Sequence, residues 1–217
     1  MGHLALPASR SSPVIRRAVA ARNTPHRFSV AEYMSLETER RTELLGGVIF
    51  DVSPKNEPHA FAVTKLAATL IRGFTGTSID VRVQDPLAVL GWHGNEAPEV
   101  DIAIVRAAEY AVTPSARDTL GFIEVSDSTY GGKYGDRRYK IPLYVNAGVP
   151  AWIVNIRLRQ VEYYGCAADL ERTHGIVSAE GTDVDILGVR VPVGSLFYKT
   201  LRQAQRDSQR SSGTRSG

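Results

Sequence analysis

Two acidic residues stand inside consecutive apolar segments of this sequence. Asp101 lies in Glu-Val-Asp-Ile-Ala-Ile-Val at 99–105, and Glu124 lies in Phe-Ile-Glu-Val-Ser at 122–126. Transfer of a carboxylate into an apolar interior is costly unless a cation or hydrogen-bond donor compensates for the lost water. Hard divalent metal ions prefer oxygen ligands. The two acids therefore indicate a metal site, a buried salt bridge, or an edge strand whose carboxylate points outward to solvent.

A basic segment follows the second acidic segment. Residues 133–140 read Lys-Tyr-Gly-Asp-Arg-Arg-Tyr-Lys and open a predicted helix, on which Asp136 and Lys140 are i,i+4 neighbours on one face. A lysine beside two carboxylates would supply the cation that phosphoryl chemistry requires. Two purely structural interpretations stay open. Arg137 or Arg138 would neutralise a buried acid, or Asp136 and Lys140 would form a surface ion pair worth about 0–1 kcal/mol.

The elements that must position these residues are mostly strands. Period-two apolar segments bounded by Gly and Pro predict short strands, and three segments with helical apolar spacing lie between them. This pattern predicts a mixed α/β domain with one central sheet. The predicted strands cover 42–45, 48–50, 79–84, 87–90, 99–106, 119–126, 151–156 and 160–165, with short pieces between 170 and 198, and the predicted helices cover 30–37, 57–74 and 136–146.

Local signals refine two of these elements. Gly46 and Gly47 separate two apolar arms and tolerate the positive φ of a tight hairpin turn, so 42–50 is predicted to be a hairpin. His59 comes at the start of the helix predicted over 57–74. We interpret it as a helix cap or surface residue rather than a catalytic base.

Charge is distributed unevenly along the 217 residues. Residues 1–27 contain five arginines and no acid, and residues 199–217 carry a net charge of +4, so of the total of +3 the middle, 28–198, carries −6. The ends lack a sustained apolar period, which predicts two disordered basic tails, at 1–27 and 199–217, around one folded domain at 28–198. The arginines of the tails could contact nucleic acid, but the simpler interpretation is a solvated extension.

The remaining composition is that of a globular protein. Hydrophobic residues make up 43% and charged residues 23% of the chain, and no segment approaches the roughly 20 apolar residues of a membrane span. Cys166 is the single cysteine, which excludes an internal disulfide framework and fits a reducing cytoplasm. We therefore expect a cytoplasmic protein with no membrane partner.

The acidic and basic segments together resemble a known family. Asp101, Glu124-Val-Ser and the continuous segment 136–155, Asp-Arg-Arg-Tyr-Lys-Ile-Pro-Leu-Tyr-Val-Asn-Ala-Gly-Val-Pro-Ala-Trp-Ile-Val-Asn, are similar in order and type to the Uma-type family of predicted bacterial restriction endonucleases. That family belongs to the restriction-endonuclease-like superfamily with the PD-(D/E)XK motif. Residues 43–49 and 53–59 also resemble its opening hairpin and loop, so the similarity covers roughly 28–197.

The resemblance implies a restriction-endonuclease-like α/β fold, in which helices flank a central mixed sheet and additional β-hairpins are attached. It implies that Asp101 and Glu124 bind Mg²⁺, with Mn²⁺ as an alternative ion. Lys140 then matches the family's helix lysine, and Glu43 matches an additional catalytic acid on the opening hairpin. Ser126 stands where the superfamily motif has its lysine. That departure leaves Lys133 as a rival lysine, and Glu99 is a rival carboxylate.

The activity implied by the resemblance is Mg²⁺-dependent endonucleolytic hydrolysis of phosphodiester bonds, with DNA as the expected partner and a homodimer as a compatible assembly. Lys133, Arg137 and Arg138 would contact the nucleic-acid backbone, which positions the substrate without reading its sequence. Without metal, the two buried carboxylates are expected to repel each other, so that neutralising either would keep or raise stability.

Two other functions stay open. The domain could be a catalytically inactive nucleic-acid-binding or interaction module on the same fold. It could also be a small-molecule phosphoesterase that uses the same metal site. The acidic middle of the chain offers little general attraction to DNA, which favours these two alternatives.

Overall fold

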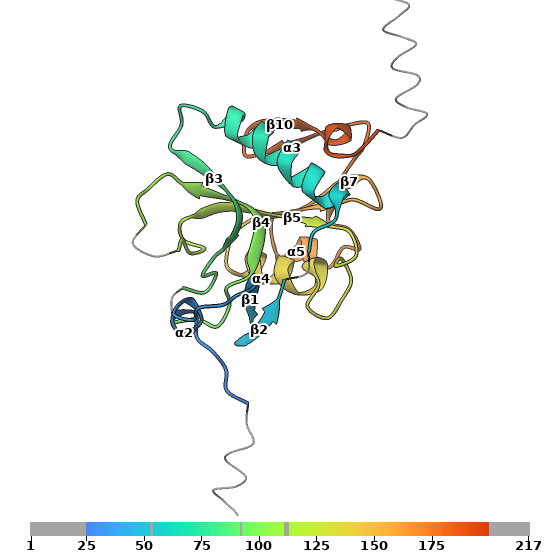
Figure 1. Cartoon of the computed structure of the whole chain (residues 1–217). Helices are drawn as coiled ribbons and strands as arrows, with labels where there is room; N and C mark the ends of the chain where they lie inside the picture. The colour runs from blue at the N-terminus through green and yellow to red at the C-terminus, as the bar shows by residue number, and fades with distance from the viewer. Residues whose placement is uncertain (1–24, 53, 92, 111–112, 200–217) are drawn as a thin grey trace, which may run out of the picture.

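A six-stranded sheet forms the centre of the protein in the computed structural model, which describes residues 25–52, 54–91, 93–110 and 113–199 (Figure 1). The mixed α/β fold with a central mixed sheet predicted from the sequence is confirmed. The strands follow one another across the sheet in chain order: β3 (Ile79–Pro86), β4 (Glu99–Arg106), β5 (Thr119–Ser126), β6 (Ala151–Asn155), β7 (Gln160–Tyr164) and β8 (Ile176–Ala179).

One pair of neighbouring strands is parallel, and this pair decides where the basic segment lies. All other neighbours in the sheet pair antiparallel, but β5 and β6 run in the same direction. Parallel strands require a connection that returns along the sheet. Here the connection contains η1 (Asp136–Lys140), one turn of π-helix, and α4 (Ile141–Asn146). The crossover therefore brings Lys140 back beside the strands that carry the two acids.

Two hydrophobic layers cover the two faces of the sheet. The helix α3 (Glu57–Gly73) packs on one face, and α4 with the short α5 (Ala167–Leu170) packs on the other (Figure 1). Alternation along β4 sends Ile102 and Ile104 to the α3 layer, and Ala103 and Val105 to the α4 layer. Because both faces are covered, the central strands are apolar on both sides. The same alternation places the Asp101 side chain on the face of β4 that carries Ala103.

Short hairpins and helices complete the fold. The hairpin of β1 (Thr42–Leu45) and β2 (Val48–Asp51) turns at Gly46 and Gly47, whose φ values of 57° and 75° are in the left-handed region, so this predicted hairpin is confirmed. The remaining elements are α2 (Val30–Met34), the antiparallel pair β9 (Asp183–Ile186) and β10 (Val189–Pro192), and the 3₁₀-helix η2 (Val193–Leu196).

The prediction of a strand at 87–90 is wrong. In the structure these residues follow an irregular path with one isolated bridge, between Ala88 and Ser115. Leu87, Ala88 and Val89 are buried, so their apolar character reflects packing in the core rather than strand pairing. The short pieces predicted after Leu170 also differ in part, since α5 ends at Leu170 and η2 occupies 193–196.

The predicted tails fall almost entirely outside the described residues, which begin at 25 and end at 199. Within the described part of the chain, no helix is both long and apolar enough to cross a bilayer.

Candidate active site

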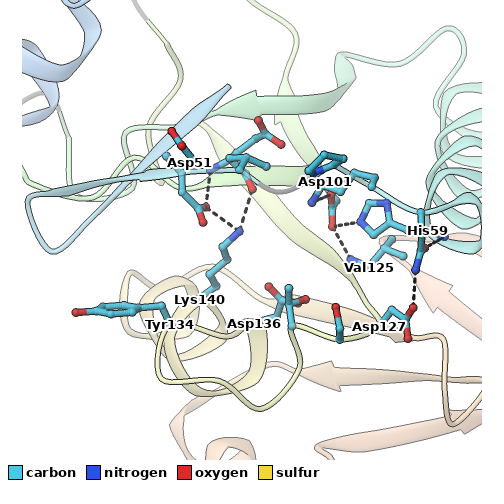
Figure 2. Close-up of a pocket in the computed structure, with 16 residues that line it drawn as sticks. Asp51, His59, Asp101, Val125, Asp127, Tyr134, Asp136 and Lys140 are labelled. Atoms are coloured by element: carbon cyan, nitrogen blue, oxygen red, sulfur yellow. Dashed lines mark hydrogen bonds and ion pairs between the residues drawn. The ribbon is translucent and has the colours of Figure 1, made fainter. Parts of the chain in front are cut away.

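A polar cavity of about 190 Å³ opens where the β1–β2 hairpin, the first turn of α3, the ends of β4 and β5, and η1 meet (Figure 2). Lys55, His59 and Lys140 are the basic groups on its wall. Because these cations face an excess of carboxylates, the cavity resembles a cation site more than an anion site. The acids on its wall are Glu43, Asp51, Glu99, Asp101, Asp127 and Asp136.

Asp101 is buried, yet its charge is well compensated. Its Oδ2 accepts hydrogen bonds from the Val125 N–H at 2.9 Å and from His59 Nε2 at 3.1 Å, and Lys55 Nζ lies 3.2 Å from Oδ1 (Figure 2). Burial alone would raise the pKa of Asp101, but His59, Lys55 and Lys140 outweigh burial and lower this pKa to about 2. The Oδ1 atom is buried and has no hydrogen-bond partner among the described residues.

Glu124 has the opposite electrostatic environment. Its side chain is fully buried, accepts a hydrogen bond from the Tyr144 hydroxyl at 2.6 Å, and has its Oε1 3.6 Å from Lys140 Nζ. Burial raises the pKa of Glu124 well above its ordinary value, although the charge of Lys140 opposes this shift. The charge of Asp101 adds to the upward shift of the Glu124 pKa, whereas at Asp101 the cationic neighbours outweigh the effects that raise the pKa.

Lys140 connects the opening hairpin to the strands of the sheet. Its ammonium lies 3.0 Å from Glu43 Oε2 and donates a hydrogen bond to the Glu99 carbonyl at 3.1 Å (Figure 2). Burial alone would lower the pKa of Lys140, but the carboxylates of Glu124 and Glu43 outweigh burial and raise it. The structure thus brings Glu43, Glu124 and Lys140 into one cluster. Glu43 and Lys140 line the cavity together with Asp101, whereas the buried Glu124 does not line it.

The π-helical turn explains why Lys140 faces inward. The Ile141 N–H bonds to the Asp136 carbonyl, five residues earlier, which widens the turn. Both Asp136 and Lys140 are buried on the cavity wall, so they do not form the surface ion pair that their spacing allowed. Asp136 instead accepts a hydrogen bond from the Thr129 hydroxyl at 2.6 Å.

The rival residues have other partners. The carboxylate of Glu99 is bound by the guanidinium of Arg41, whose Nε donates at 3.0 Å. Lys133 is exposed, with its ammonium 5.1 Å from the centre of the Tyr134 ring. Arg137 donates to the carbonyls of Leu170 and Arg172, so it neutralises neither buried acid.

A family model decides the classification of the chain. The model, named Uma2 and described as "Putative restriction endonuclease", matches residues 30–184. The chain belongs to the Uma2 family. The resemblance seen in the acidic and basic segments is therefore confirmed.

A solved structure supports the same fold for this Uma2 domain. The crystal structure of a protein described as a putative nuclease belonging to DUF820, from Anabaena variabilis, superposes with a TM-score of 0.61 at 14% identity. The superposition covers 78% of this chain and 97% of that chain. At this low identity the likeness concerns the fold. No curated protein matches the chain.

Two basic residues of the Uma2 site escaped the sequence interpretation. His59 is neither a surface residue nor the cap, because Asn56 caps α3 by accepting from the His59 N–H and the imidazole is buried against Asp101. Its place follows from helical spacing, since it stands three residues before the buried Ala62. Lys55 lies in the loop before α3, where no periodic pattern predicts which way its side chain points.

The carboxylates of this Uma2 domain fit a metal that retains water ligands. Among the residues that the structure describes, no group of three or more His, Cys, Asp or Glu side chains is placed to hold a metal ion. Mg²⁺ does not need such a group, because it is commonly held by one or two carboxylates and its own waters. The buried Oδ1 of Asp101 on the cavity wall accepts no hydrogen bond from the described residues and has the Lys55 ammonium 3.2 Å away, so it is the atom that such an ion would contact in place of Lys55.

Proposed function

We propose that this Uma2-family chain is a Mg²⁺-dependent endonuclease that hydrolyses phosphodiester bonds in DNA. The observation that supports this most is Asp101 Oδ1, a buried carboxylate oxygen without a hydrogen-bond partner, on a cavity that also contains the Lys140 ammonium. A purely structural buried carboxylate would accept hydrogen bonds at both oxygens, whereas Oδ1 accepts none and has only an ion-pair contact with Lys55, at 3.2 Å, among the described residues. The Uma2 classification and the nuclease-like fold support the same reaction class.

Asp101 and Glu124 are the residues that would hold the metal, with Mn²⁺ as an alternative ion. When bound, the ion would make a coordinated water more acidic and offset negative charge on the phosphate. The chain prepares Asp101 for this task, because His59 and the Val125 N–H fix Oδ2 and thereby orient Oδ1. Glu124 must ionise to become a ligand, and its burial makes this costly without a cation.

Lys140 is the residue that would act on the phosphate. Its ammonium is held by Glu43 at 3.0 Å and by the Glu99 carbonyl at 3.1 Å, and its raised pKa keeps it protonated at neutral pH. A fixed positive charge on the wall of a small cavity stabilises charge that develops on phosphate oxygens. Glu43 would act as a positioning residue, because its carboxylate contacts the Lys140 ammonium and accepts a hydrogen bond from the Glu99 N–H.

Cleavage assays test this proposal directly. Linear, supercoiled and single-stranded DNA would each be incubated with the protein and Mg²⁺ or Mn²⁺, with EDTA and the Asp101→Asn variant as controls. We expect nicking or cleavage that requires the metal and disappears in both controls. Metal-dependent cleavage that survives Asp101→Asn would place the site elsewhere. No cleavage of any of the three DNA forms would contradict the proposal.

One observation favours an inactive binding module as the second candidate. Lys55 Nζ lies 3.2 Å from the Asp101 Oδ1 that a metal would need, and its charge already helps to neutralise that carboxylate. A module of this kind needs no Mg²⁺. Calorimetric titration with Mg²⁺ separates the two functions, since binding that is lost in Asp101→Asn supports the enzyme and absence of binding supports the module.

A further inference from the structure

A second cleft lies beside the segment that joins β5 to η1. It has a volume of about 360 Å³ and is lined by Tyr130, Gly131, Arg137, Arg138, Arg172 and Thr173. Three of its six lining residues are arginines and none is acidic. Its chemistry is therefore opposite to that of the acid-rich cavity that contains Asp101.

Arg137 is the fixed cation of this arginine cleft. Its Nη2 donates to the Leu170 and Arg172 carbonyls, both at 2.6 Å, and its guanidinium carbon lies 4.7 Å from the centre of the Tyr164 ring. These contacts hold the guanidinium in one orientation before any ligand arrives, so binding loses little side-chain entropy. Its Nε is buried and has no hydrogen-bond partner in the described part of the chain.

Arg138 and Arg172 bring the remaining charge of the cleft. Both side chains are exposed. Arg172 forms an i,i+3 ion pair with Asp169 at 3.5 Å, in which the arginine is exposed and the aspartate is buried. Two exposed guanidinium groups beside a fixed one suit a planar or tetrahedral anion, which guanidinium groups bind through paired N–H donors.

The arginine cleft and the acidic cavity share one wall. Thr129 and Asp136 line the cavity, whereas their neighbours Tyr130 and Arg137 line the cleft. The segment 129–137 therefore has one side toward each site. A polymer with a phosphate at every repeat would cross this segment and place one phosphate on each side.

We propose that the arginine cleft is a phosphate-binding subsite that holds the backbone of the nucleic acid next to the scissile bond. This inference rests on the proposed function for its choice of ligand. The electrostatics of the chain require such a subsite, because residues 28–198 carry a net charge of −6 and the cavity wall is rich in carboxylates. Without a local group of cations, a polyanion would be repelled from the catalytic cavity.

Binding assays in EDTA test the subsite without cleavage. A fluorescein-labelled single-stranded oligonucleotide would be titrated with the native protein, with Arg138→Gln, with Arg172→Gln and with the double variant, over a series of salt concentrations. Each lost phosphate contact should lower the slope of log K against log salt by roughly 0.7 for a single strand. Both residues are exposed, so the fold should persist, which a melting curve would check.

Arg190→Gln is the matched control. Arg190 is an exposed arginine on β10, in the layer on the opposite face of the sheet from α4 (Figure 1), and it forms an exposed ion pair with Asp183 at 3.7 Å. It removes the same charge from the protein, so it reports the effect of net charge alone. We expect its affinity and salt slope to equal those of the native protein.

Inorganic phosphate serves as the second probe, measured by calorimetry. Oligonucleotide binding that weakens in the cleft variants but not in Arg190→Gln supports the subsite. If only inorganic phosphate binding depends on the cleft arginines, the site takes free or terminal phosphate and the backbone assignment is wrong. If neither probe responds, the cleft binds no phosphate. Arginine-dependent binding by a protein that never cleaves DNA would leave the subsite standing and overturn only the proposed nuclease function.

Discussion

The two acids of the candidate site are the same chemical group on neighbouring strands, yet the protein treats them in opposite ways. The Asp101 half contains Lys55, His59 and the Val125 N–H, which together lower the pKa of Asp101 to about 2. The Glu124 half contains Tyr144 and Lys140, and burial raises the pKa of Glu124. Burial is almost complete for both, so the number and closeness of donors decides the difference.

This contrast assigns different duties to the two carboxylates. Asp101 is a permanent anion, ready to attract a cation before substrate arrives. Burial raises the pKa of Glu124, so the ionised form of Glu124 costs more free energy than that of Asp101.

The largest expected effect is that of Lys140→Met, which removes the cation of the Glu124 half. Cleavage should be abolished, because Glu43 and Glu124 lose their shared partner and the phosphate loses the fixed charge. Lys133→Met should weaken DNA binding and leave cleavage of bound DNA intact, since Lys133 is exposed and does not line the cavity. Cleavage and binding assays on the two variants compare them. Cleavage by Lys140→Met with none by Lys133→Met would reverse the lysine assignment.

Asp101→Asn should lower the cleavage rate by at least roughly 10²-fold, the scale for loss of one major electrostatic group. It should also destabilise the metal-free protein by about 2 kcal/mol, because the folded state lowers the pKa of Asp101 from 3.8 to about 2. A lowered pKa gives stability that is present above pH 3.8 and is lost as the pH falls through about 2. Chemical denaturation at pH 7 and pH 3 measures the difference. Equal stability of variant and native protein at pH 7 would remove the distinction between the halves.

Glu124→Gln should lower the rate on the same roughly 10²-fold scale but keep or raise stability. Since the folded state raises the pKa of Glu124, its carboxylate costs stability above the ordinary value of 4.5, and the cost disappears as the pH falls below it. The variant should therefore be more stable than the native protein at pH 7, and the two should be equally stable near pH 4. A loss of stability at pH 7 would show that Tyr144 and Lys140 compensate the charge more fully than the pKa indicates.

Removal of both predicted tails should have the smallest effect, because the residues of both halves lie within 28–198. The truncated chain 28–198 should melt within about 5 °C of the full chain. The cut removes Arg27, whose Nη1 donates to the Gly46 carbonyl at 2.8 Å at the turn of the β1–β2 hairpin. Differential scanning calorimetry of the two chains tests this. A larger decrease would show that a tail packs on the domain.

The parts of the structure that could be predicted are those with a local signal. Asp101 and Glu124 interrupt apolar strands, Gly46-Gly47 marks a turn that needs positive φ, and the position of Lys140 followed from the resemblance of its helix to the family. Period-two alternation and the order of the segments were sufficient to place the strands of Asp101 and Glu124 on one mixed sheet.

The missed parts depend on contacts between distant segments. Nothing near Lys55 in the sequence indicates that its ammonium would meet a strand that begins at Glu99. The opposite pKa shifts of the two acids also depend on partners from other elements, so sequence position alone predicted repulsion for both. At 87–90 the apolar residues pack in the core through tertiary contacts and do not pair as a strand.

The distance along the chain between Glu43 and Lys140 bears on when the site forms during synthesis. Their ion pair closes a loop that includes α3 and the strands β3, β4 and β5. Contacts between such distant segments form slowly, because the chain loses the entropy of loop closure before the contacts contribute favourable free energy. A nascent chain with only the hairpin, α3 and the two acidic strands therefore lacks the lysine. The topology delays assembly of the centre until most of the domain has left the ribosome.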